Sequence, residues 1–134
     1  MKRSNLYSPR HCDGRAPRDC GAVAIQLLLD VDYAEARTIA FRHGFSSTSG
    51  TPRGMVNIAL EGAGRNLTLV YANGDKVGPT LIQVGAKLDK NAEFLIYVPR
   101  HVVAMKKGAL HNVNGTENFV VTEIYLVEEN CFSN

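Results

Sequence analysis

The chain has 134 residues, 45% of them hydrophobic and 21% charged, which suits one domain with its own core. The formal net charge of +2 is too small to demand a nucleic-acid or membrane partner. There is no secretory segment near the start and no apolar run long enough to span a bilayer, so we expect a cytoplasmic protein.

The three cysteines, Cys12, Cys20 and Cys131, are an odd number without disulfide-like spacing, so we expect reduced thiols. Basic residues gather ahead of Cys20: Lys2, Arg3, Arg10, Arg15 and Arg18. This cluster forms either an electropositive lip beside Cys20 or a solvated arm, and we favour the arm. It lacks the pattern of alternating aromatic and basic residues that binds nucleic acid, so we do not expect such a partner.

Residues 1–19 contain two prolines and show no periodicity, which predicts an irregular N-terminal arm. Residues 20–134 are expected to form a single domain. An apolar helix is predicted from Cys20 to about Asp30, with Asp19 as its N-cap, and its lack of a polar face indicates burial in the core.

A second helix is predicted from Tyr33 to Arg42, with Asp32 as N-cap, Glu35 completing a capping box and Gly44 ending the helix. Its expected apolar side is Tyr33, Ala36, Ala40 and Phe41. Residues 45–52 form a loop that we expect to be able to cover a substrate. A third helix is predicted over 53–61, with Met55, Ile58 and Ala59 buried.

Strands dominate the second half of the sequence. We predict strands over 67–71, 93–98 and 119–127, a short helix over 80–87, and a hairpin formed by 101–105 and 109–113. Helices come first and strands second, without βαβ alternation. This order predicts an α+β fold in which N-terminal helices, with the Cys20 helix at the centre, pack on a C-terminal antiparallel sheet.

Cys20 is the first candidate for chemistry. A thiol in the first helical turn lies beside backbone N–H groups that lack intrahelical partners and at the positive end of the helix dipole. Both favour the thiolate, which is the nucleophilic form. The alternative is a small cysteine at the edge of the core with no reactive role. In an active site the Cys20 backbone N–H would donate to the oxyanion, and the sequence identifies no second donor.

His101 and Asn112 are the candidates that would act on this thiol. His43 is expected at a helix end and His11 in the arm, whereas His101 begins a strand. If residues 107 and 108 form a two-residue turn, Val103 lies opposite Asn112, and His101 shares that face as a diagonal neighbour. Asn112 is then able to orient the imidazole. A register shifted by one residue would bring His111 to that face instead.

The order and spacing of these residues resemble papain-like cysteine peptidases, in particular a group of small proteins of bacteria and phages. The matching segments are Arg18-Asp19-Cys20, Tyr33-Ala34-Glu35-Ala36, Gly50-Thr51 and His101-Val102-Val103-Ala104, with Gly108 and Asn112. The resemblance covers roughly residues 17–113, and its layout is similar to the bacteriocin-processing peptidase domains of transporters. The group carries Asp where this chain has Asn112, although Asn orients the histidine in papain itself. Papain-like enzymes also usually carry a glutamine a few residues before the cysteine, and residues 10–19 contain none.

The resemblance implies a papain-like fold and a Cys20–His101–Asn112 triad that cleaves a peptide or amide bond without a cofactor. The expected partner is a peptide or protein substrate, in the host cytoplasm if a phage encodes the chain. An alternative is a weakly active or inactive papain-like protein that binds a host protein. A further alternative is a metal site formed by His11, Cys12 and Cys20 with His101 or Cys131, but zinc sites usually show paired ligands at short spacing, which are missing here. We therefore expect no metal.

Overall fold

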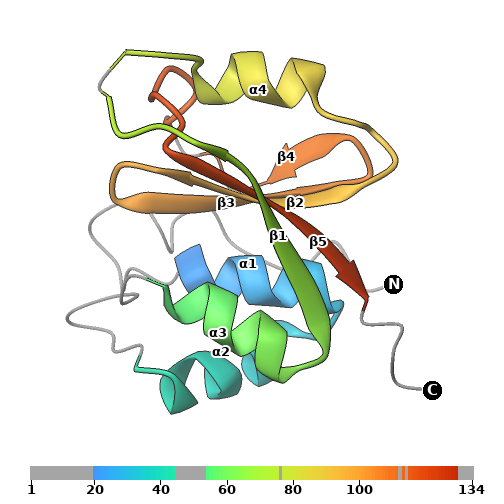
Figure 1. Cartoon of the computed structure of the whole chain (residues 1–134). Helices are drawn as coiled ribbons and strands as arrows, with labels where there is room; N and C mark the ends of the chain where they lie inside the picture. Colours follow the sequence, from blue (N-terminus) through green and yellow to red (C-terminus); the bar gives the residue numbers. More distant parts are fainter. Residues whose placement is uncertain (1–19, 45–53, 76, 112, 114, 130–134) are drawn as a thin grey trace.

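The computed structural model describes residues 20–44, 54–75, 77–111, 113 and 115–129 (Figure 1). The expected N-terminal arm and the loop over 45–52 lie outside these residues. The described elements are α1 (Cys20–Leu29), α2 (Tyr33–Arg42), α3 (Met55–Gly62), β1 (Arg65–Ala72), α4 (Leu81–Lys87), β2 (Glu93–Val98), β3 (His101–Lys106), β4 (Ala109–His111) and β5 (Glu123–Glu129).

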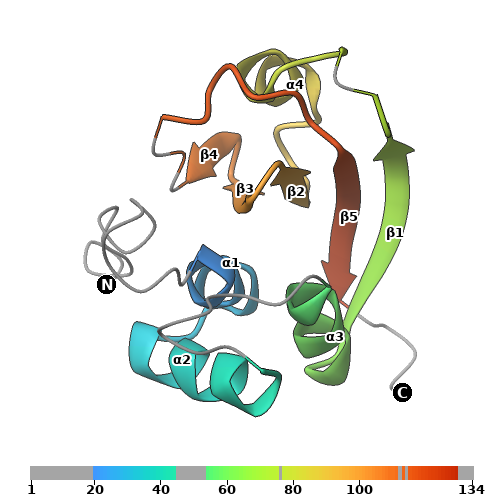
Figure 2. The ribbon, with the colours of Figure 1, turned by 90° about the vertical axis from the view of Figure 1, so that its left-hand side faces the viewer.

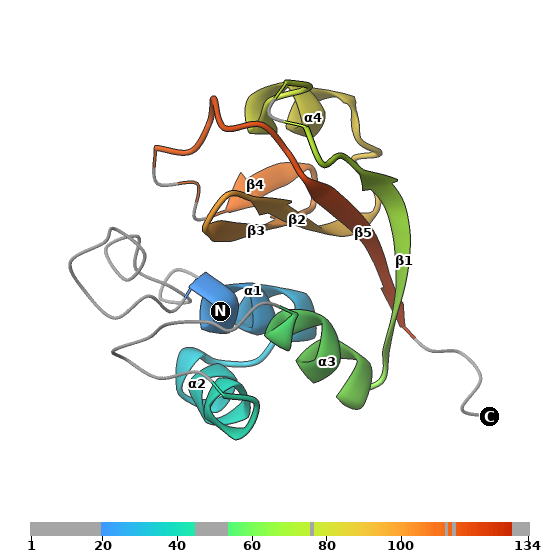
Figure 3. The same ribbon diagram turned by 60° about the vertical axis from the view of Figure 1, so that its left-hand side comes forward.

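One five-stranded antiparallel sheet organises the chain, with the strand order β1-β5-β2-β3-β4. The strand β5 comes last in the sequence and lies between β1 and β2. The helices α1 and α3 lie on one face of this sheet and α4 lies on the other, while α2 packs on α1 away from the strands (Figures 1 and 3). The predicted α+β class with an antiparallel sheet is confirmed.

The sheet separates two hydrophobic clusters because successive side chains of a strand point to opposite faces. On β3, Val102 and Ala104 belong to the cluster that contains α1, α2 and α3. Val103 and Met105 belong to the cluster beneath α4. Every residue of β3 from His101 to Met105 is buried, so this strand is covered on both faces of the sheet.

Local signals in the sequence define several elements as predicted. The Asp32 side chain accepts a 2.8 Å hydrogen bond from the Glu35 N–H at the start of α2. Lys107 and Gly108 have φ of 54° and 80°, the two positive values that a type I′ turn requires. The predicted hairpin register is also present, with Lys106 opposite Ala109 and Met105 opposite Leu110.

The predicted buried sides of two helices need correction. Ile58 of α3 is 60% exposed, and Phe41 of α2 is 49% exposed. On α3 the buried residues are Met55, Val56, Ala59 and Leu60. This pattern turns the buried side by one residue relative to the prediction, because α3 must face both α1 and β1.

The last strand also begins later than predicted, at Glu123 instead of residue 119. Thr122 still donates its N–H to the Tyr97 carbonyl of β2, but the backbone of residues 117–121 bonds outside the sheet: the N–H groups of Leu81 and Ile82 donate to the carbonyls of Phe119 and Glu117. These N–H groups belong to the first turn of α4 and have no partner within the helix. The segment is therefore fixed to α4 and is not part of the sheet ladder.

Candidate functional site

Two cations fix the C-terminal end of α1. Lys106 Nζ, at the end of β3, donates a 2.7 Å hydrogen bond to the carbonyl of Leu27, and Arg65 Nε, at the start of β1, donates a 3.3 Å bond to that of Leu28. The last turn of α1 has no basic residue of its own, so these side chains satisfy its carbonyls and complement the negative end of the dipole. The contact to Lys106 aligns α1 with β3.

The N-terminal end of α1 consequently lies near the start of β3. The helix α1 packs along β3, and its ten residues rise by about 14 Å while the six residues of β3 extend about 17 Å, so their first residues lie toward the same end of the sheet. Both start at the same end of the sheet, at the left of Figure 1 and toward the viewer in Figure 2. These first residues are Cys20 and His101.

Cys20 is the first residue of α1 and is 8% exposed. It belongs to the buried cluster that also contains Val102, the residue next to His101. The first turn of α1 contains no acidic side chain that would oppose a thiolate. Asp19, the predicted N-cap, lies outside the described residues.

His101 is the first residue of β3 and is 9% exposed. It pairs across the sheet with Val98, a member of the cluster beneath α4. Strand alternation therefore puts the imidazole on the side of Val103, while Cys20 packs on the side of Val102. The thiol and the imidazole therefore lie at the same end of the sheet but on opposite faces. A contact between them has to pass around the end of β3, beside the Pro99–Arg100 turn.

Asn112 lies outside the described residues, but its neighbours fix the register of the hairpin. Ala104 lies opposite His111. This pair agrees with the register predicted from the two-residue turn. His43 has the helix-end position expected for it, with Nδ1 3.0 Å from the carbonyl oxygen of Ile39.

His101 also lines a pocket that the sequence did not predict. The pocket has a volume of about 360 Å³, and its lining is Pro99, Arg100, His101, Thr116 and Phe119. One wall is the 116–119 segment, which is fixed to the start of α4 through the Phe119 carbonyl. Pro99-Arg100 between two predicted strands is a turn signal that could have indicated one side of this pocket, whereas no local signal brings Thr116 and Phe119 to His101.

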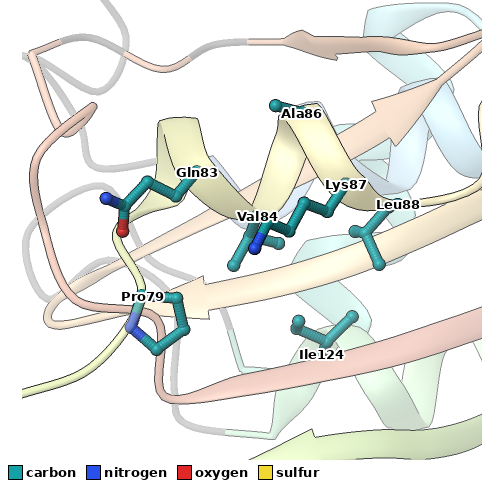
Figure 4. Close-up of a pocket in the computed structure, with 7 residues that line it drawn as sticks. All are labelled: Pro79, Gln83, Val84, Ala86, Lys87, Leu88 and Ile124. Carbon is teal, nitrogen blue, oxygen red and sulfur yellow. The ribbon is translucent and has the colours of Figure 1, made fainter.

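A larger pocket of about 530 Å³ lies between α4 and β5 (Figure 4). Its lining is Pro79, Gln83, Val84, Ala86, Lys87, Leu88 and Ile124. The polar side chains among them are those of Gln83 and Lys87, without a thiol, an imidazole or a carboxylate. This lining suits an apolar group and offers no acid–base pair, so the candidate chemistry belongs to the end of the sheet that carries His101.

The metal alternative involved residues that the structure does not describe: His11, Cys12 and Cys131. Within the described ranges, no group of three or more His, Cys, Asp or Glu side chains is placed to hold a metal ion. In the same ranges, no helix combines the length and the apolar character needed to cross a membrane.

Comparison of the chain with protein-family models, with curated proteins and with solved structures gives no match. The functional argument therefore depends on the residues and geometry described above.

Proposed function

We propose that this protein is a papain-like thiol hydrolase that cleaves a peptide or amide bond. The observation that supports the proposal most strongly is that α1 and β3 begin at the same end of the sheet, with Cys20 and His101 as their first residues. In this proposal Cys20 is the nucleophile, His101 is the general base and then the general acid, and Asn112 orients His101.

The chemistry follows from these roles. His101 takes the thiol proton, and the Cys20 sulfur attacks the carbonyl carbon of the scissile bond. The Cys20 backbone N–H donates to the resulting oxyanion at the positive end of α1. The imidazolium then gives its proton to the leaving amine, which leaves an acyl-enzyme. A water molecule activated by the same imidazole hydrolyses the thioester and regenerates the thiol.

The test is the rate at which iodoacetamide alkylates each cysteine, with the label located by mass spectrometry. We expect Cys20 to react faster than Cys12 and Cys131, even though it is 8% exposed, because a base and a helix N-terminus favour its thiolate. His101→Gln should remove this advantage. His43→Gln is the matched control, since His43 lies at the end of α2. Equal labelling of the three cysteines in the unmodified chain contradicts the proposal.

A second candidate is a papain-like protein that binds a host protein without cleaving it. The observation that favours it is the strand alternation, which directs the imidazole of His101 to the face opposite Cys20. In this case Cys20→Ala retains both partner binding and biological effect, and the captured partner keeps its full length. Loss of the effect in Cys20→Ala, with the fold intact, argues for the hydrolase.

A further inference from the structure

Arg100 has an unusual backbone conformation for its residue type. It is the second residue of the two-residue turn between β2 and β3, which is flanked by the pair Val98 and His101. The ring of Pro99 holds its own φ near about −65°, and Arg100 has a φ of 61°. Proline followed by positive φ is the pattern of a type II turn, whose second position favours Gly or Asn.

Among the described residues, two other non-glycine residues have positive φ, Lys107 and Asp30, and in each the conformation has a local structural role. Lys107 precedes Gly108 in a type I′ turn, which requires positive φ at both positions. Asp30 directly follows α1, where left-handed residues often end a helix, and Asp tolerates this conformation better than most residues. Arg100 has a long side chain that offers no comparable local hydrogen bond to the backbone.

Arg100 lines the pocket beside His101. It is exposed, and it forms no ion pair with any residue in the described part of the chain. No Asp or Glu lines this pocket, while the rings of Pro99 and Phe119 give it apolar walls. A cation and an imidazole beside apolar walls suit a carboxylate attached to a short aliphatic group.

We propose that Arg100 and this pocket bind a carboxylate of the substrate, next to the bond that is cleaved. The substrate is then a peptide or amide with an acidic side chain or a terminal carboxylate at that position. Backbone strain at Arg100 is retained because a guanidinium beside His101 recognises this group. This inference rests on the proposed hydrolase, and it adds the substrate class.

The test measures binding without catalysis, in the full chain carrying Cys20→Ala. N-acetylglutamine amide has no carboxylate, N-acetylglutamate α-amide has only the side-chain carboxylate, and N-acetylglutamine has only the α-carboxylate. Each compound is titrated while the ring signals of His101 are followed by NMR, assigned with His101→Gln. We expect saturable shifts with at least one of the two acids and none with the neutral amide. The acid that binds identifies the carboxylate as a side chain or a chain end.

Arg100→Gln should weaken binding by about fivefold to tenfold, as expected for loss of one charge-assisted hydrogen bond near the surface. Arg100→Lys should retain part of the affinity. Lys107→Gln is the matched control, because it removes the same charge from another exposed hairpin turn outside the pocket. Arg100→Gly should raise the unfolding midpoint while it weakens binding, which separates recognition from folding.

Equal binding of all three compounds, or unchanged affinity in Arg100→Gln, overturns the inference. Because these titrations need no reaction, they are independent of the alkylation test. Selective carboxylate binding together with an unreactive Cys20 would leave the pocket valid and the hydrolase wrong. A reactive Cys20 without carboxylate selectivity would support the hydrolase and show that the proposed carboxylate pocket is wrong.

Discussion

Lys106 Nζ donates a 2.7 Å hydrogen bond to the carbonyl oxygen of Leu27, and this contact ties the end of β3 to the last turn of α1. It joins two elements whose other ends carry His101 and Cys20. The Lys106 side chain also lies 3.7 Å from Asp30, but that carboxylate is 73% exposed and adds little. The hydrogen bond to a helix carbonyl is the stronger contribution, since it satisfies a buried acceptor and complements the dipole.

Lys106→Met should therefore lower the free energy of unfolding by about 1–2 kcal/mol, measured by urea denaturation. Lys107→Met is the matched control, because Lys107 is the next residue along the chain and its side chain is exposed. Asp30→Asn should change stability by less than about 0.5 kcal/mol. If Lys106→Met and Lys107→Met have the same effect, the contact to Leu27 does not stabilise the fold.

The capping box of α4 should affect both stability and the pocket beside His101. Thr80 Oγ1 accepts from the N–H of Gln83 at 3.4 Å, and the side chain of Gln83 accepts from the Thr80 N–H at 2.9 Å. Thr80→Ala should cost about 1 kcal/mol in a urea titration. It should also shift the ring signals of His101, since the start of α4 holds the Phe119 carbonyl.

Thr38→Ala is the control for this substitution. Thr38 is exposed within α2, and its hydroxyl donates to the carbonyl of Ala34 one turn earlier, a bond that contributes little to helix stability. We expect no loss of stability and no change at His101. An unchanged His101 spectrum in Thr80→Ala would mean that the wall of the pocket does not depend on α4.

The elements that the sequence predicted correctly depend on neighbouring residues. The cap at Asp32 and the turn at Lys107–Gly108 each need only two to four residues, so local preference determines them. The hairpin register followed because a type I′ turn fixes which residues face each other. The resemblance to papain-like proteins added the expectation of a site at the start of the Cys20 helix, and that function stays a prediction.

The features that the sequence did not predict depend on contacts between distant residues. Nothing near Glu123 indicates that the last strand inserts between β1 and β2. The exposure of Ile58 follows from the direction in which α3 packs, which a hydrophobic period alone does not define. The pocket of Arg100 needs Thr116 and Phe119, which long-range hydrogen bonds hold against α4.

The turn between β3 and β4 offers a stabilising substitution. Lys107 has positive φ, and Asn adopts this conformation at lower cost, so Lys107→Asn should raise the free energy of unfolding by about 0.5–1 kcal/mol. Gly108→Ala should lower it by about 1–2 kcal/mol, because φ is 80° and a new Cβ would lie 3.1 Å from the Lys90 side chain. Both are measured by urea denaturation, and a loss of stability in Lys107→Asn would contradict the type I′ geometry.

Gln26 is the most unfavourable buried side chain in the described part of α1. It is 1% exposed, and neither its amide nitrogen nor its amide oxygen has a hydrogen-bond partner among the described residues. Burial without hydrogen bonds costs free energy that an apolar side chain of similar shape does not lose. Met has a similar length and helix propensity, so Gln26→Met should raise the free energy of unfolding by about 1–2 kcal/mol.

Gln83→Met is the matched control, because it makes the same chemical change at an exposed residue that has a structural role. It removes the 2.9 Å bond to the Thr80 N–H and should lower stability by a few tenths of a kcal/mol to about 1 kcal/mol. The two substitutions are therefore expected to have opposite signs in the same urea titration. A larger loss in Gln26→Met than in Gln83→Met would mean that the buried amide is hydrogen-bonded, for which an internal water is the simplest partner.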